Sequence, residues 1–449
     1  MNIHERTNTP RRRQAAKNAV RSGDGYAQSP EAARASAKRP ASATRLLTGL
    51  TGLVAAVAAI VALKRLDLPL HEKTLLTIFC TAAAMIVVDF VAYRTWTNPS
   101  AGMALRAANA WSVERIVSKL VGFWATIGAV AVAYSIFPEY HGGFYAEPLA
   151  AARLMLPWLL LASPFYIAYV DRRQAEPEDI YAELGRFLTA RGPLPRRELL
   201  GQHARAWLVK GFFLPLMFAY LATGLHDVWA VDVTKLWGNF GALYEASYDA
   251  IFLIDLLFAV VGYLFTFRLL DTHIRSAEPT VAGWVVCLIC YQPFWSIIGS
   301  NYLQYEQDKF YWGGLTAGHP VIYVAWGSLI LAASAIYAVS TVAFGLRFSN
   351  LTHRGIITSG PYRWTKHPAY FFKCLSFWLI SIPFLSNQGI EAALAQSALL
   401  ILGNAIYVAR AYTEEKHLSR DPVYREYQQF IREHGAVARL VKLVKPALR

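Results

Sequence analysis

The sequence predicts an all-α polytopic membrane protein, and three observations carry that prediction. Hydrophobic residues make up 55% of the 449 residues and charged residues only 16%, which is too apolar for a soluble protein of this length. Apolar runs near the ~20 residues that a helix needs to cross a bilayer follow one another along most of the chain. Spans this closely spaced leave no room for a lipid-exposed sheet, so the expected architecture is a helical bundle.

Ten apolar runs are expected to cross the membrane as helices. They lie at about 45–63, 73–93, 116–137, 149–170, 207–225, 247–270, 279–299, 320–344, 368–386 and 389–409. A boundary is expected near 300–320. It would separate an amino-terminal bundle of seven spans, residues 44–310, from a carboxy-terminal module of three spans, residues 319–449.

The first 43 residues are predicted to be a disordered, basic, cytoplasmic tail. They contain nine Lys/Arg against three Asp/Glu and few large aliphatic residues, so they can bury too little apolar surface to fold. The apolar run that follows has spanning length and no small-residue cleavage pattern, which argues against a cleaved signal. We interpret the tail as an orientation signal that also contacts anionic lipid head groups, and not as a nucleic-acid binding segment.

The distribution of basic residues predicts that both termini face the cytoplasm of an inner or plasma membrane. The basic loops at 94–115, 171–205, 271–276 and 347–366 fall on the side of the tail. The loops at 138–147, 226–240 and 301–315 fall on the other side and are rich in Trp and Tyr, as the positive-inside rule and the aromatic belt require.

No disulfide framework or metal site is expected. All four cysteines, Cys80, Cys287, Cys290 and Cys374, lie inside apolar runs, and the Cys287/Cys290 spacing has no further ligands near it in sequence. Asp255 lies deep in a span. It is expected either to form a structural hydrogen bond or to contact substrate.

The first polar cluster is SGPYRWTKHPAY, from Ser359 to Tyr370. Its Gly-Pro pair predicts a turn at the membrane surface, and Pro368 favours the first turn of the next helix. His367 would then lie at a helix amino terminus, where free amides and the positive end of the dipole suit an anionic ligand group. The aromatic and basic residues around it, including Tyr362 and Tyr370, make this a candidate binding site.

The second polar cluster, RAYTEEKHLSRDPVYREY, runs from Arg410 to Tyr427. Arg410 and Glu414 are four residues apart and share a helix face, whereas Glu415 is rotated away from it. A helix-surface ion pair between Arg410 and Glu414 is the plainest interpretation. A short helix after Asp421 would carry Tyr424, Tyr427 and Phe430 on one side and could lie on the module as a lid.

Together the two clusters resemble the isoprenylcysteine carboxyl methyltransferase family and related membrane phospholipid methyltransferases. The shared pattern is a GPY turn, a basic residue, HP with an aromatic, two short spans, then Arg with a Glu-Glu pair, Leu and Tyr-x-x-Tyr, over about residues 340–430. Lys366 stands where Arg is commoner, and Phe372 stands where a small Gly often follows. Phe372 would narrow the tunnel through which a lipid reaches the cofactor.

The resemblance implies a site for S-adenosylmethionine and a role for each matching residue. The residues implied to surround the cofactor are Tyr362, His367, Pro368, Tyr370, Glu414 and Glu415. Arg410 and Glu415 look like the pair that this family places beside the methyl acceptor.

The chemistry of these residues agrees with that implication. Acidic side chains suit the amino and sulfonium groups of the cofactor, while His and helix amides suit its carboxylate. The planar fork of Arg410 suits a carboxylate acceptor. No strand followed by GxGxxG occurs, which disfavours a soluble nucleotide-binding fold.

We therefore expect an integral membrane S-adenosylmethionine-dependent methyltransferase that O-methylates a carboxylate on a lipidic or prenyl-type acceptor. Two alternatives stay open. Membrane sterol-type reductases share a similar HP-x-Y hairpin and use NADPH, and a transporter or structural membrane protein could carry the same module.

Overall fold

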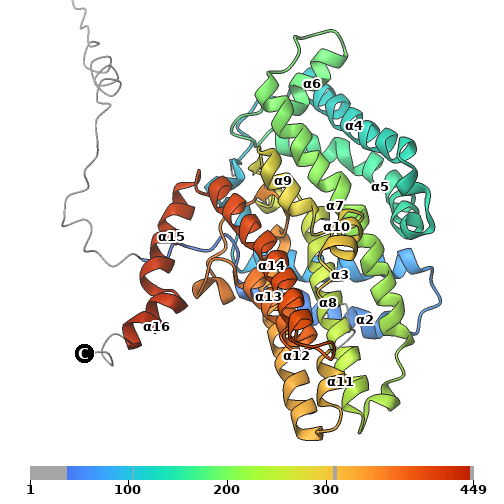
Figure 1. Ribbon diagram of the computed structural model, residues 1–449. Coiled ribbons are helices and arrows are strands. Elements are labelled where there is room, and N and C mark those ends of the chain that lie inside the picture. Colours follow the sequence, from blue (N-terminus) through green and yellow to red (C-terminus); the bar gives the residue numbers. More distant parts are fainter. Residues whose placement is uncertain (1–37, 105, 307–310, 445–449) are drawn as a thin grey trace, which may run out of the picture. The chain divides into compact units, whose positions relative to one another are not determined.

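The computed structural model describes residues 38–104, 106–306 and 311–444, and the chain from Arg39 onward forms one compact unit (Figure 1). The predicted tail falls outside the described residues as far as residue 37. The described part is almost entirely helical. Its two strands, β1 (Ser276–Ala277) and β2 (Thr352–His353), form one antiparallel pair in which Ser276 lies opposite His353. The predicted all-α class is confirmed.

Eight helices in the described residues are long and apolar enough to cross a membrane. They are α2 (Leu46–Leu63), α3 (Leu70–Val91), α4 (Val113–Ile136), α5 (Ala146–Asp171) with the turn before it, α7 (Arg197–Ala230), α8 (Phe240–Leu264), α12 (Pro320–Val342) and α14 (Ile390–Leu418). This confirms a polytopic helical membrane protein.

The prediction of ten spans is corrected at two places. The run at 279–299 forms two short helices, α9 (Val281–Leu288) and α10 (Phe294–Tyr302), and the run at 368–386 forms the 14-residue α13 (Pro368–Ser381). A proline lies at both breaks, where its ring disfavours the helical region for the residue before it and removes an amide donor. Proline does not always end a helix here, since α7 continues through Pro215. Pro293 separates α9 from α10. Pro383 follows Ile382, which ends α13 in the left-handed region with φ of 43°.

The remaining helices are short. They are α6 (Ile180–Leu188), α11 (Trp312–Thr316), α15 (Pro422–His434) and α16 (Ala436–Val444), with 3₁₀ turns η2 (Thr95–Thr97), η3 (Pro99–Ala101), η4 (Pro138–His141), η5 (Gly143–Tyr145), η6 (Val233–Leu236), η7 (Arg268–Leu270), η8 (Gly345–Arg347) and η9 (Gly360–Arg363).

The core lies where α3, α7 and α8 meet, and it includes the fully buried Ile78, Phe213 and Leu257. Apolar side chains on the outer face of α5, such as Leu161 and Phe165, are exposed, as expected for a surface that lipid covers. Helices approach closely where residues are small. A Cβ at Gly49 of α2 would lie 2.0 Å from the carbonyl oxygen of Val342 in α12.

The four loops that were predicted to share one face of the membrane are hydrogen-bonded to one another. The carboxylate of Asp271 accepts from Asn98 (3.1 Å) and Ser100 (2.7 Å) and pairs with Arg347 (3.0 Å). Gln202 donates to the carbonyl oxygen of Arg275 at 2.9 Å, which ties in the fourth loop. These contacts agree with a common face. Its cytoplasmic orientation stays a prediction.

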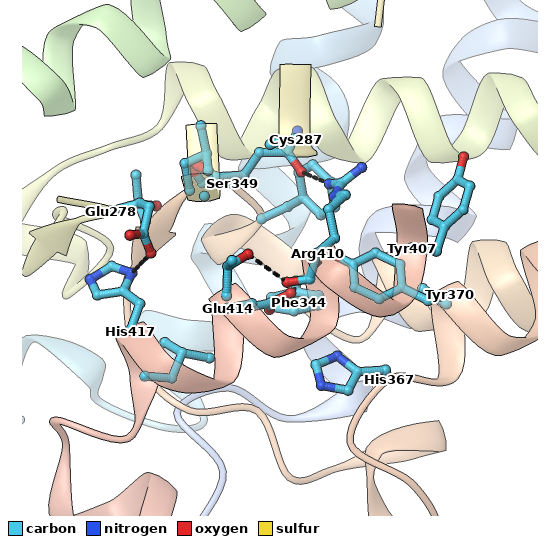
Figure 2. Close-up of a pocket in the computed structure, with 18 of the residues that line it drawn as sticks. Glu278, Cys287, Phe344, Ser349, His367, Tyr370, Tyr407, Arg410, Glu414 and His417 are labelled. Carbon is cyan, nitrogen blue, oxygen red and sulfur yellow. Dashed lines mark hydrogen bonds and ion pairs between the residues drawn. The ribbon is translucent and has the colours of Figure 1, made fainter. Parts of the chain in front are cut away.

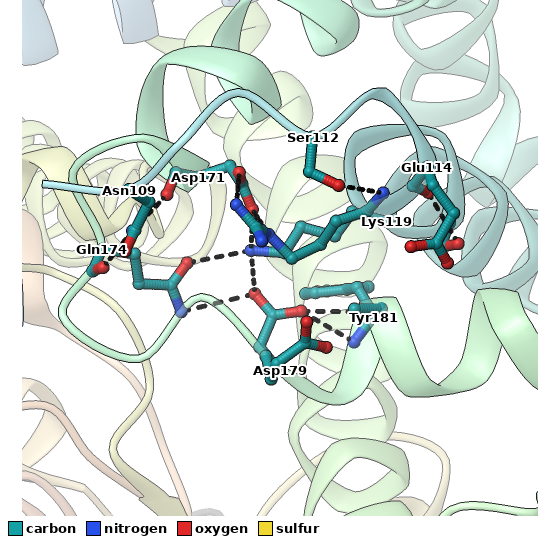
Figure 3. A network of polar contacts seen from close by, with 12 residues as sticks. Asn109, Ser112, Glu114, Lys119, Asp171, Gln174, Asp179 and Tyr181 are labelled. Atoms are coloured by element: carbon teal, nitrogen blue, oxygen red, sulfur yellow. Dashed lines mark hydrogen bonds and ion pairs between the residues drawn. The ribbon is translucent and has the colours of Figure 1, made fainter. Parts of the chain in front are cut away.

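A buried ionic network ties α4, α5 and α6 together on the same face (Figure 3). The Lys119 ammonium lies 3.0 Å from Asp171 and 3.1 Å from Asp179, the N-cap of α6. Arg115 makes a two-point contact with Asp171, at 2.8 and 2.7 Å. Because the charges balance and are hydrogen-bonded, we assign this network to the structure of the loop face and not to catalysis.

Arg354 anchors the loop that leads into the carboxy-terminal module. Its buried guanidinium donates to five carbonyl oxygens, those of Gly262, Phe265, Thr272, Leu346 and Phe348. Two of them belong to the carboxy-terminal end of α8, where helix carbonyls have no partner within the helix and a cation is favourable. Burial lowers the pKa of Arg354 to about 9 and the neighbouring Arg347 adds to the shift, so the charge persists at neutral pH.

Candidate active site

A cavity of about 990 Å³, counted with its open mouth, lies between α9, α12, α13 and α14 (Figure 2). Five of the predicted site residues line it, namely Tyr362, His367, Tyr370, Arg410 and Glu414. Pro368 and Glu415 are not among the lining residues. Pro368 is buried at the first position of α13, where its missing amide proton leaves no helix bond unmade.

The GPY turn forms as the sequence predicts, and α15 holds it in place. Gly360 has φ of +59°, a conformation that a residue with a side chain adopts only with strain, and it starts the 3₁₀ turn η9, in which Pro361 is the second residue. Tyr427 of α15 donates its hydroxyl to the carbonyl oxygen of Tyr362 at 2.6 Å. Tyr424 is buried in the same cluster. The helix proposed as a lid is thus packed against the turn that carries Tyr362.

Glu415 holds His367 in position. Its carboxylate accepts from His367 Nε2 (2.8 Å), Lys366 Nζ (2.6 Å) and Gln428 Nε2 (3.2 Å). The His367 ring stacks on that of Tyr370, with centroids 5.5 Å apart and planes 6° from parallel. Arg410 lines the cavity and Glu415 does not, and the placement of this pair beside the acceptor stays a prediction. Glu415 is rotated onto the next face of α14, so it orients His367 and does not line the cavity.

Glu414 and Arg410 both face the cavity, but they are not paired with each other. Tyr370 donates its hydroxyl to Glu414 Oε2 at 2.9 Å. Arg410 donates to Asn350 Oδ1 at 3.1 Å, and its guanidinium carbon lies 5.1 Å from the Tyr370 ring centroid. Within the described residues no carboxylate oxygen lies within 4.0 Å of an Arg410 nitrogen. The expected ion pair along the helix is therefore not formed.

One wall of the cavity comes from the amino-terminal bundle, which sequence reasoning did not place at the site. Glu278 lies 3.6 Å from His417 Nδ1 and accepts from the backbone amide of Thr280 at 2.9 Å. A Cβ at Gly283 would lie 2.5 Å from Cγ of Glu278, so glycine makes room for this carboxylate. Cys287 of α9 also lines the cavity. Glu278 precedes α14 by more than a hundred residues, and nothing in their local sequence links them.

Asp255 forms the structural hydrogen bonds that were one of its two expected roles. It accepts from Tyr337 Oη at 2.6 Å and from Thr341 Oγ1 at 2.5 Å. Both donors line the cavity, whereas Asp255 does not. It therefore supports the wall from behind.

Comparison with known proteins agrees with the sequence pattern. Residues 318–425, about a quarter of the chain, match a family model described as phospholipid methyltransferase. No curated protein and no solved structure matches the chain. The matched region contains α12, α13 and α14, whereas α9 lies outside it.

The cavity, the eight apolar helices and this match indicate an integral membrane protein with a methyltransferase module. As its two polar clusters predicted, the carboxy-terminal module of this chain is similar to the phospholipid methyltransferase family.

Proposed function

We propose that this protein is an S-adenosylmethionine-dependent methyltransferase whose cofactor and lipid acceptor meet in the cavity between α13 and α14. The observation that carries the proposal is the cavity itself. Within the family-matched region it presents a carboxylate, Glu414, and a guanidinium, Arg410, that do not neutralise each other.

The cavity residues near the amino terminus of α13 fit the cofactor. Glu414 and the hydroxyl of Tyr370 suit its amino and sulfonium groups, and His367 at the amino terminus of α13 suits its carboxylate. Glu415, which also accepts from Lys366, holds the His367 ring in place, and this reduces the conformational entropy that the site loses on binding. When bound, S-adenosylmethionine would supply an electrophilic methyl group. The chain would supply alignment, which contributes ~7–11 kcal/mol in well-oriented reactions.

Arg410 supports a carboxylate acceptor. It is 8% exposed, permanently charged and without a carboxylate partner within 4.0 Å in the described part of the chain. An acceptor carboxylate held there would form a bond from its oxygen to the methyl carbon while the carbon–sulfur bond breaks. A carboxylate is already deprotonated, so this reaction needs no base.

The family match favours a second acceptor class, the amino head group of a phospholipid. An ammonium must lose a proton before it can attack, and Glu278 with His417 is the cavity pair that could receive it. The repulsion between an ammonium and Arg410, ~1–4 kcal/mol for charges ~4 Å apart, weighs against this class.

Membrane placement completes the proposal. The cofactor is a soluble metabolite of the cytoplasm, so the face formed by the four hydrogen-bonded loops and both termini would face that compartment. The basic amino-terminal segment would contact anionic head groups there.

Calorimetric titration of the purified protein in lipid nanodiscs tests the cofactor assignment. Wild type should bind S-adenosylmethionine and not NADPH, and His367→Ala or Glu414→Ala should abolish the binding. Glu426→Ala, at an exposed position on α15, serves as the matched control. Binding of NADPH alone would favour the reductase alternative. Wild-type affinity in either cavity variant would remove that residue from the assignment.

A further inference from the structure

Lys373 is a charged wall residue that the mechanism above does not use. It follows Tyr370 by one turn of α13 and lines the same cavity. Its ammonium nitrogen lies 5.3 Å from the ring centroid of Tyr337 and 5.8 Å from that of Tyr407. Among the described residues, no carboxylate oxygen lies within 4.0 Å of it.

The nearby Asp255 does not form an ion pair with Lys373. Its carboxylate already accepts from the hydroxyls of Tyr337 and Thr341. The Lys373 ammonium instead lies near two tyrosine rings, and cation–π contacts offset only part of its desolvation. A partly buried ammonium without a carboxylate partner is costly, and such a group is typical of a ligand-binding position.

The antiparallel packing of α13 and α14 places Lys373 one layer farther along the cavity than Arg410. Along α13 from its amino terminus, contacts join His367 to Glu415, then Tyr370 to Glu414 and Arg410, and then Lys373 to Tyr407. One helical turn rises ~5.4 Å. The cavity therefore presents two cations about one turn apart, with Arg410 nearer the amino terminus of α13.

We propose that Lys373 is a specificity-determining residue that binds a second anionic group, a phosphate, on the tail side of the acceptor group held by Arg410. The inference rests on the proposed function in one respect, that the acceptor occupies this cavity. An ammonium binds phosphate as a point charge, and a phosphate a few bonds from a reacting head group matches the spacing of one turn. An isoprenoid acceptor with a single carboxylate would leave Lys373 without an anion.

The test uses the full-length protein and a pair of lipids that differ in the phosphate. Binding of dioleoyl phosphatidic acid and of dioleoylglycerol is measured in detergent by native mass spectrometry, without cofactor. Wild type should prefer the phosphate-bearing lipid by on the order of tenfold or more. Lys373→Met should remove that preference, and Lys373→Arg should restore most of it.

Lys210→Met is the matched control. Lys210 also lies over an aromatic ring within a span, 4.6 Å from the Trp207 centroid, but it does not line the cavity. Its substitution should leave the lipid preference at the wild-type value. Melting temperatures of all variants distinguish loss of binding from loss of fold.

Three outcomes would decide against the inference. An undiminished preference for phosphatidic acid in Lys373→Met would overturn it, and so would an equal loss in Lys210→Met. Displacement of the lipid by equimolar inorganic phosphate would assign the subsite to a soluble phosphate and overturn the role in acceptor choice. Titration of the same samples with S-adenosylmethionine reports separately on the proposed function, because the lipid measurements contain no cofactor.

Discussion

Substituting Arg410 by lysine tests whether the guanidinium binds the acceptor or only contributes a positive charge to the cavity wall. Lysine keeps the positive charge and most of the length, but it loses the planar fork. In the structure that fork reaches Asn350 at 3.1 Å and lies 5.1 Å from the centroid of the Tyr370 ring. A single ammonium cannot keep the Asn350 bond and also hold a carboxylate at two points.

The expected magnitude follows from the lost hydrogen bond. A hydrogen bond to a charged group is worth ~1.5–3 kcal/mol, and ~1.4 kcal/mol in the barrier is a tenfold change in rate. Arg410→Lys should therefore lower turnover by at least about tenfold. Cofactor affinity should stay at the wild-type value, because Glu414, Tyr370 and His367 are unchanged.

The assay follows the transfer of labelled methyl groups from S-adenosylmethionine to membrane lipids. Methanol released by alkali identifies an ester, whereas alkali-stable label identifies an N-methyl product. Arg439→Lys is the control, because Arg439 also stacks on an aromatic ring, 4.4 Å from the Trp364 centroid, outside the cavity. Full turnover in Arg410→Lys, or label that alkali does not release, would refute the carboxylate assignment.

Three further predictions concern stability, pH and topology. Arg354→Met removes the guanidinium that donates to five carbonyl oxygens, of which that of Phe265 keeps a second donor, the Thr272 hydroxyl. It should destabilise the fold by ~3 kcal/mol or more and lower the melting temperature in detergent, whereas the exposed Arg363→Met should not. Burial lowers the pKa of His273 to about 3, and the positive charge of Arg268 adds to the shift. Below pH 6.5 this histidine is therefore protonated in the unfolded chain but stays neutral in the folded protein. Stability should then fall toward lower pH by up to ~1.4 kcal/mol per pH unit, and His273→Gln should flatten melting-temperature curves between pH 7.5 and 5.5; curves of equal slope would contradict this cause. A cysteine introduced at Ala190 should be labelled only after the cells are opened, and labelling of intact cells would reverse the orientation.

The helices could be predicted where apolar length alone decides the outcome. Runs such as 320–344 contain no interior proline, and the structure forms α12 (Pro320–Val342) there. The runs at 279–299 and 368–386 are as apolar, but Pro293 and Pro383 break them. Hydropathy averages over a window and does not register one missing amide, so these two runs were predicted at full length.

The candidate site could be predicted only where its residues are close in sequence. Tyr370 and Glu414 lie on the two helices of one hairpin, and their contact follows from the hairpin. Glu415 was predicted to face the acceptor, but whether it points to the cavity or to Lys366 depends on the rotation of α14 against α13. Glu278 reaches the site through packing between distant segments, and no local pattern encodes that contact.

The wall that α9 contributes has a consequence for how this protein could evolve. The proposed cofactor residues and Arg410 all lie inside the family-matched region, whereas Glu278, Gly283 and Cys287 lie outside it. The proposed acceptor residues Arg410 and Lys373 stay within the matched region, so this region would set both the chemistry and the anionic groups that the acceptor must carry. Mutations in the α9 segment would change only the opposite wall, so one side of the cavity could vary while the side that holds these two cations is kept.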